Sequence, residues 1–178
     1  MIEQKGSNYQ HITNQYFTLV KDIRAGKETA VQELTALWDS DGVLEFVGAP
    51  PISGTFKGKA AIQTLYSNRV KAVGMPMKLE SKGVQEEAAL GTVDSHVHTT
   101  RMMDENRVVA GWTTTVGTRD GRGFQVAGSH AFTFRNGKIS SLKVVVSPKH
   151  EEAPNLKATD LAVNDIGRLA LAAWLIVA

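Results

Sequence analysis

One acidic side chain in this sequence lies where it could act as a base. Glu45 belongs to a predicted strand on which Val43 and Val47 share its face, while Leu44 and Phe46 occupy the other face. A carboxylate enclosed by apolar side chains can serve as a general base. From the strand alone we favour a different explanation, in which Glu45 faces solvent near a sheet edge, because charges there oppose association between edges.

Two tyrosines and one histidine could donate hydrogen bonds from apolar surroundings. Tyr16 and Tyr66 lie on the apolar faces of predicted helices. His130 shares one face of a predicted strand with Phe132 and Phe134. Core packing with a satisfied polar atom is the usual explanation for such residues. The functional alternative is a phenol or an imidazole that donates a hydrogen bond to a ligand.

A second pair of histidines has a spacing that is compatible with metal binding. His96 and His98 alternate on one strand face with Asp94 and Thr100. Two histidines two residues apart on a strand can form half of a metal site. The same pattern also occurs on solvated sheet faces, and the local spacing supplies no third ligand. We therefore expect no metal, and keep a metal-dependent enzyme as an alternative.

The composition indicates a single globular domain. The chain has 178 residues and no cysteine, which excludes disulfides and thiolate catalysis. Its 20 basic and 18 acidic residues are interspersed, so no basic face indicates nucleic-acid binding. The longest apolar run covers residues 169–178 and is about half as long as a membrane span. We expect a soluble, cytoplasmic protein with no membrane span.

The order of predicted elements places helices first and strands later. Helical periodicity predicts three helices, over residues 9–25, 28–38 and 59–73, with a short strand over 42–47. Alternating Thr, Val and aromatic residues then predict four or five antiparallel strands, near 77–85, 93–103, 107–118, 123–135 and 139–147. This order is typical of the α+β class, not of alternating β-α-β units.

The chain divides into a domain and an extension. Residues 1–148 are expected to form the domain, and residues 149–178 a polar linker followed by a C-terminal helix. The final ten residues of this helix, predicted over 157–177, are apolar almost all round, so we expect the helix to be buried as a lid or as an interface element.

Several stretches resemble the nuclear transport factor 2-like superfamily, which includes SnoaL-like polyketide cyclases and ketosteroid isomerase. Three are most similar to ketosteroid isomerase: YFTLV at residues 16–20, VGAPPISG at 47–54 and AIQTLY at 61–66. Two are typical of SnoaL-like strands: NRVVAGWT at 106–113 and FTFRNGKI at 132–139. The resemblance implies a cone-shaped (cystatin-like) fold, with N-terminal helices on a curved antiparallel sheet and a C-terminal helical extension added to it.

The resemblance also implies roles for four residues. Glu45 falls at the position of the catalytic base of ketosteroid isomerase, where that family has aspartate. Tyr16 falls on the tyrosine of the oxyanion hole, and Tyr66 on a second tyrosine that supports the first. His130 falls on the second donor, again in place of aspartate. Further residues would line the pocket: Trp38, Val43, Val47, Trp112, Phe132 and Phe134.

The implied chemistry is isomerisation or elimination next to a carbonyl group. Glu45 would remove a proton α to the carbonyl of a hydrophobic small molecule, while Tyr16 and His130 donate to the oxygen as it gains charge. No metal or organic cofactor is implied, and the superfamily implies a homodimer through the sheet. The alternative is a non-catalytic module of the same fold that binds a small ligand or a protein, since fold does not fix function.

Overall fold

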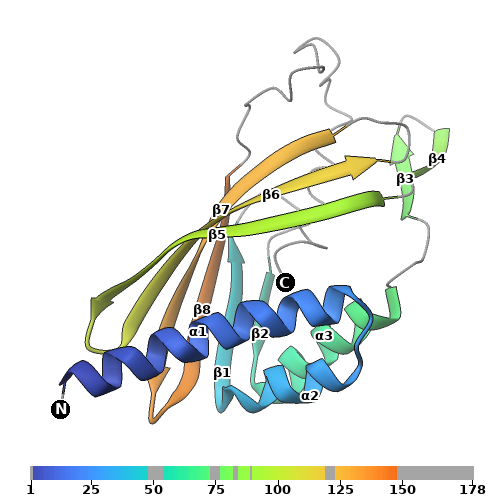
Figure 1. The fold of residues 1–178 in the computed structure, drawn as a ribbon. Coiled ribbons are helices and arrows are strands. Elements are labelled where there is room, and N and C mark those ends of the chain that lie inside the picture. The colour runs from blue at the N-terminus through green and yellow to red at the C-terminus, as the bar shows by residue number, and fades with distance from the viewer. Residues whose placement is uncertain are drawn as a thin grey trace.

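Three helices lie on one face of a six-stranded sheet in the computed structural model (Figure 1). The structure describes residues 2–47, 54–72, 77–81, 84–88, 90–118 and 123–147. The helices are α1 (Ile2–Arg24), α2 (Thr29–Ala36) and α3 (Lys59–Ala72). The sheet strands are β1 (Trp38–Val47), β2 (Gly54–Lys57), β5 (Leu90–Asp104), β6 (Arg107–Thr118), β7 (Gly123–Arg135) and β8 (Lys138–Ser147).

The strands follow the order β2-β1-β8-β7-β6-β5. Consecutive strands from β5 to β8 are antiparallel neighbours, whereas β1 pairs with β8 in parallel. The long strands curve over α1, as Figure 1 shows. A separate two-stranded sheet is formed by β3 (Met77–Ser81) and β4 (Val84–Ala88). The α+β class and the cone-like arrangement of helices on a curved sheet are thereby confirmed.

The helices form where apolar residues recur at the helical period. In α1 the buried residues Ile12, Tyr16, Leu19, Val20 and Ile23 lie on one face, as predicted. The helix ends at the expected glycine: Gly26 adopts a φ of 82° and its N–H donates to the carbonyl of Ile23, 3.0 Å away. The helix starts at Ile2, earlier than the predicted residue 9.

Four features of the strands differ from the predictions. Trp38 begins strand β1 and does not end the second helix, because its indole packs over Gly42, where a Cβ would lie 2.8 Å from the ring. The short strand β2 and the parallel pairing of β1 with β8 were not predicted. The single strand expected over 77–85 is the hairpin of β3 and β4.

The predicted linker and C-terminal helix, residues 149–178, lie outside the described residues.

The core lies between the helices and the sheet face that they cover. Leu44 and Phe46 of β1 are buried on this face, aligned with Leu142 and Val144 of β8. His130 pairs with Val144 across the β7–β8 ladder and so lies on the same face. We call this the helix-covered face and its reverse the opposite face. None of the three described helices has the length and apolar character needed to cross a membrane.

Candidate active site

A pair of buried tyrosines joins α1 to α3. The phenol oxygens of Tyr16 and Tyr66 lie 2.7 Å apart, and both side chains are fully buried. Burial raises the pKa of Tyr16 well above its ordinary value, an effect that the adjacent Tyr66 reinforces, and raises the pKa of Tyr66 to about 12. Both phenols are therefore neutral at physiological pH. One donates within the pair, and the phenol that accepts keeps its own proton for a second acceptor.

His130 is held in one tautomer by a tryptophan on the neighbouring strand. The indole Nε1 of Trp112, on β6, donates to Nδ1 of His130, on β7, over 2.8 Å. In the neutral imidazole this bond places the ring proton on Nε2, because Nδ1 is the acceptor. His130 is only 3% exposed, and its ring centroid lies 5.8 Å from that of Tyr16. The histidine and the phenol pair therefore belong to one buried cluster.

A glycine makes the room for this tryptophan. Gly128 lies directly opposite Trp112 in the β6–β7 ladder. A Cβ at position 128 would lie 2.3 Å from Cζ2 of Trp112 and 2.5 Å from the carbonyl oxygen of Val145. Real side chains do not approach that closely, so only glycine allows the indole to lie across the strand and to reach His130.

Two arginines lie at the edge of the phenol pair. Arg69, on α3, is 4% exposed, and its Cζ lies 5.8 Å from the ring centroid of Tyr66. Arg24, at the end of α1, donates from Nη1 to Oγ of Ser95 over 2.7 Å, and Ser95 shares a 2.9 Å hydrogen bond with the buried Thr114. Burial lowers the pKa of each arginine to about 10, so both remain cationic at physiological pH.

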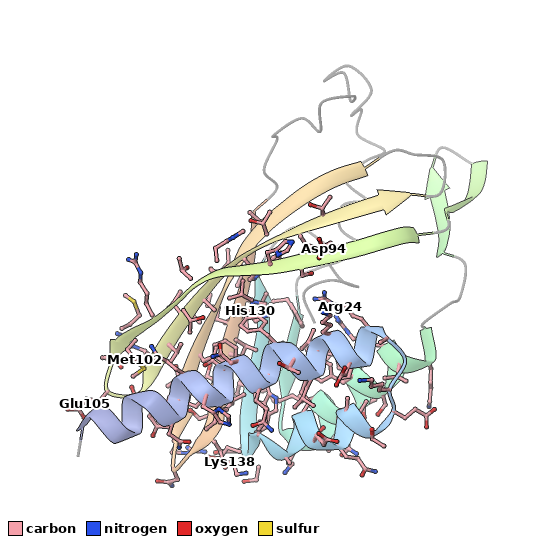
Figure 2. All side chains as sticks on the ribbon, viewed as in Figure 1. Arg24, Asp94, Met102, Glu105, His130 and Lys138 are labelled. Carbon is pink, nitrogen blue, oxygen red and sulfur yellow. The ribbon has the colours of Figure 1, made fainter. Side chains whose placement is uncertain are left out.

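The side chains of Arg24 and His130 reach this region from different elements. Figure 2 shows Arg24 extending from the end of α1 toward the strands, and His130 between the sheet and α1. Together with the two tyrosines they form a set of hydrogen-bond donors that belong to α1, α3 and β7. Such a set can bind an oxygen atom that carries partial or full negative charge.

The structure does not place Glu45 in this cluster. Glu45 pairs with Lys143 in the β1–β8 ladder, its Oε2 lies 3.9 Å from Nζ of Lys143, and its side chain is 45% exposed. Val43 and Val47 share this opposite face, so they do not line the site either. The physical reason is the strand alternation itself. The large side chains of Leu44 and Phe46 take the helix-covered face, and Glu45 must then point away from it.

The other expected lining residues lie on the helix-covered face, mostly as packed core. Phe132 contacts both Tyr16 and His130, with ring centroids 5.2 and 5.9 Å apart. Phe134 stacks on Tyr9 at 4.5 Å, farther along the core. Trp38 is 1% exposed and packs over Gly42. Of the predicted lining residues, Trp112 and Phe132 both contact His130.

The histidines of the metal alternative lie on the exposed part of β5, and each has a hydrogen-bond partner in the protein. His96 hydrogen-bonds Asp94 across 3.0 Å, and His98 hydrogen-bonds Oγ1 of Thr113 across 2.5 Å. All three of the potential ligands are exposed. Within the described part of the chain, no three His, Cys, Asp or Glu side chains gather closely enough to hold a metal ion.

Sequence reasoning missed the two arginines and the glycine of this site. The signal for the arginines was their position on the apolar faces of their helices. Arg24 lies eight residues after Tyr16 and Arg69 lies three residues after Tyr66, and these spacings place each pair on one helix face. Gly128 carried no such signal, because its requirement arises only from the register between β6 and β7.

Comparison with known proteins matches residues 22–142 to the family described as SnoaL-like domain. No curated protein sequence is significantly similar to the chain. Similar solved structures include a nuclear transport factor 2-like protein of unknown function from Exiguobacterium sp. 255-15, with 16% identity, a TM-score of 0.54 and coverage of 78% of this chain and 99% of that chain.

Two further similar structures are of proteins whose names state an activity. One is a putative SnoaL-like polyketide cyclase from Jannaschia sp. CCS1, with 9% identity, a TM-score of 0.54 and coverage of 80% of this chain and 87% of that chain. The other is a LEH-like epoxide hydrolase from M. tuberculosis, with 14% identity, a TM-score of 0.52 and coverage of 80% and 84% respectively. At these identities the similarity shows the fold alone.

Proposed function

Because the chain belongs to the family of SnoaL-like domains, we propose that it is an isomerase or lyase that acts next to the carbonyl group of a hydrophobic small molecule. Tyr16 and His130 polarise the carbonyl oxygen in this proposal. The reaction class is that of ketosteroid isomerase: a base takes a proton from the carbon next to the carbonyl while negative charge develops on the oxygen. The enolate then regains a proton at another carbon, which is isomerisation, or expels a leaving group, which is elimination.

One observation carries the proposal: two neutral donors with fixed orientation are buried side by side. The two phenol oxygens lie 2.7 Å apart, and in the proposal Tyr66 donates to Tyr16, which leaves the proton of Tyr16 for the ligand. Trp112 donates to Nδ1 of His130, so the proton of the neutral imidazole is on Nε2. A donor of this kind is already oriented before the charge develops, and in a buried site its hydrogen bond is stronger than in water. Polarisation of a carbonyl is therefore the chemistry that this arrangement favours.

The proposal covers the polarising groups and not the base. The described residues of the cluster are donors, and Glu45, which the family resemblance names as base, lies on the opposite face beside Lys143. This observation favours a second candidate function, a non-catalytic module that binds an oxygen-bearing ligand through the same donors. The two candidates differ in one respect, since only the enzyme turns its ligand over.

Turnover of a panel of β,γ-unsaturated ketones tests the proposal, with the absorbance of the conjugated enone as readout. Tyr16→Phe removes one donor, and we expect kcat to fall by about 100- to 1,000-fold, the effect of losing one oxyanion-hole donor. Tyr9→Phe is the matched control on the same helix, because Tyr9 stacks on Phe134 outside the cluster. We expect its rate to remain within about twofold of the unmodified protein.

The outcomes separate the two candidates. An undiminished rate in Tyr16→Phe would exclude Tyr16 as the polarising group. If the unmodified protein binds the ketones without converting them, and Tyr16→Phe weakens that binding, the binding module is the correct function.

A further inference from the structure

The end of α1 is tied to the sheet by a chain of two hydrogen bonds. Arg24 donates from Nη1 to Oγ of Ser95 on β5 over 2.7 Å, and Ser95 shares a 2.9 Å bond with Oγ1 of Thr114 on β6. Thr114 lies two residues from Trp112 and is fully buried on the same helix-covered face. The chain therefore lies beside the Trp112–His130 pair, and Figure 2 shows Arg24 extending toward the strands.

The cover over this face of the sheet ends along β5. Ser95 and Val97 are paired with Thr114 and Trp112 across the β5–β6 ladder, so all four residues belong to the helix-covered face. Thr114 and Trp112 are buried, whereas Ser95 is exposed and Val97 is 41% exposed. The hydrogen bond from Arg24 to Ser95 thus lies at the border of the buried region.

Strand β5 is also bonded less completely than its neighbours. It is the edge strand of the sheet and pairs only with β6, whereas β6, β7 and β8 each have a strand on both sides. Its pairing with β6 is irregular between Val97 and Thr99, where the register shifts. Local opening starts where the fewest bonds must break. The first half of β5, beside the end of α1, meets that condition.

The donors of the candidate site have almost no contact with solvent. Tyr16 and Tyr66 are fully buried, and His130 is 3% exposed. A ligand can reach these donors only after part of their cover has moved, as in enzymes whose sites open and close around a substrate.

We propose that Arg24, Ser95 and Thr114 form a latch: when the bond from Arg24 to Ser95 breaks, the end of α1 and the first half of β5 separate and admit the ligand. We call these three residues the α1–β5 latch. The identity of the ligand site rests on the proposed function, which places the ligand at Tyr16 and His130. The opening itself is a property of the protein and can be measured without any ligand.

Hydrogen exchange of the indole N–H of Trp112, followed by NMR, measures the opening. This N–H is buried and donates to His130, so it exchanges with solvent deuterium only when its surroundings open. Ser95→Ala removes the acceptor of Arg24. We expect the exchange of Trp112 to become about 10- to 100-fold faster, the effect of losing one hydrogen bond to a charged group. Ser95→Thr keeps the hydroxyl and should keep the exchange slow.

The indole N–H of Trp38 is an internal reference in the same spectrum. Trp38 is 1% exposed and is aligned with Ile139 at the start of β8. Trp112 is aligned through Gly128 with Val146, seven residues farther along β8, which is about 23 Å. Opening at the latch should therefore leave the exchange of Trp38 within about threefold of its rate in the unmodified protein.

Thr99→Ala is the matched control for loss of a hydroxyl from β5. Thr99 is exposed and is paired with Gly111, which alternates with Trp112 along β6, so Thr99 lies on the opposite face. This variant should leave the exchange of both indoles within about threefold of the unmodified protein.

Stopped-flow binding of 2-naphthol then connects the latch to ligand entry. The phenolic oxygen of 2-naphthol can accept from Tyr16, and its fluorescence reports binding. The latch does not touch the bound ligand in this proposal. We therefore expect Ser95→Ala to raise the association and dissociation rate constants together, each by about tenfold, and to leave Kd within about threefold.

The outcomes separate the latch from the function on which its role rests. The latch is overturned if Ser95→Ala leaves the exchange of Trp112 unchanged, or accelerates Trp112 and Trp38 equally, which would indicate a general loss of stability. If Trp112 alone exchanges faster but the rate constants for 2-naphthol do not change, the ligand enters elsewhere and the proposed route is wrong. If Trp112 alone exchanges faster and 2-naphthol binds to neither protein, the opening is supported and the proposed function is contradicted.

Discussion

The helix-covered face of the sheet and the opposite face both carry titratable side chains. The two faces differ in how far these side chains are buried and in what they bond to. On the helix-covered face, His130 is 3% exposed and bonded to the indole of Trp112. On the opposite face, the side chain of Glu45 is 45% exposed, and its Oε2 lies 3.9 Å from Nζ of Lys143, whose side chain is 52% exposed. A buried polar group must have its partner in the protein, whereas an exposed one can exchange that partner for water.

This difference decides which face is suited to chemistry. The partners of Tyr16 and His130 fix where their donors can point, so no reorganisation is needed when charge develops on a substrate. The Glu45–Lys143 pair is solvated and contributes little to holding either group in place. The comparison therefore favours the helix-covered face for the proposed chemistry, and variants on the two faces should differ strongly in their effects.

The largest effect is expected at the glycine that makes room for Trp112. In Gly128→Ala the new methyl group would meet the indole and a backbone carbonyl, so strands β7 and β8 or the indole must move. Overpacking of this kind costs about 1–3 kcal/mol of unfolding free energy, measurable by urea denaturation. The displaced indole should also change its fluorescence, because it can no longer reach His130.

Gly54→Ala is the control for the general effect of replacing a glycine in a strand. Its Cβ would meet only the ring of Phe56, at 3.6 Å, which is an ordinary contact. We expect its unfolding free energy to stay within about 1 kcal/mol of the unmodified value. Equal effects at the two positions would show that the close packing of Trp112 on Gly128 does not constrain the helix-covered face.

The sequence was sufficient to predict the three described helices and the fold class. The apolar face of α1 and its end at Gly26 follow from local periodicity and from the conformational freedom of glycine, both of which are readable in one segment. The alternation of β1 was also predicted, with Glu45 on one face and Leu44 on the other. What local sequence could not decide was which of these two faces is covered by the helices.

The site required pairings between distant segments. Family resemblance suggested that Glu45 belongs with Tyr16, but the register of β1 on β8 pairs it with Lys143 instead. Analysis of the strand alone favours a solvent-facing Glu45 near a sheet edge. Its exposure agrees with this prediction, but β1 is paired on both sides and is not the edge strand. The bond from Trp112 to His130 likewise depends on the register of β6 on β7, which no local pattern specifies.

After the effect of Gly128→Ala, the next largest predicted effect on stability comes from the ionisation of the buried phenols at high pH. The pKa of Tyr66 is raised from 10.0 to about 12, and that of Tyr16 also lies well above 10.0. The folded protein therefore keeps protons that the unfolded chain loses. The resulting stability is complete below pH 10 and is lost as the pH rises toward 12. Arg24 and Arg69, whose pKa values are lowered to about 10, act with the opposite sign over the same range.

Because these contributions oppose each other, the phenols should be followed directly by the ultraviolet absorbance of tyrosinate. The chain has three tyrosines, and Tyr9→Phe leaves only the buried pair. We expect this variant to show almost no tyrosinate until the pH approaches 12, with circular dichroism confirming that it is still folded. Substantial ionisation of the folded variant near pH 10 would mean that the pair is not buried as described.

The smallest effect is expected on the opposite face. Glu45→Gln removes the charge from a pair whose two side chains are 45% and 52% exposed. Such pairs contribute at most about 1 kcal/mol, so the unfolding free energy should change by less than that. Lys143→Gln and the double variant with Glu45→Gln and Lys143→Gln complete a double-mutant cycle. We expect the coupling energy between the two residues to be near zero.

Glu45→Gln also gives the sharpest contrast between the two faces in activity. As the base implied by family resemblance, Glu45 would be essential, and its replacement would abolish turnover of the ketone panel. Its position beside Lys143, pointing away from Tyr16, leads us to expect a rate within about twofold of the unmodified protein. A folded Glu45→Gln protein that binds the ketones normally and does not convert them would show that β1 presents this carboxylate to the substrate during the reaction. The division of the sheet into a reactive and a solvated face would then no longer hold.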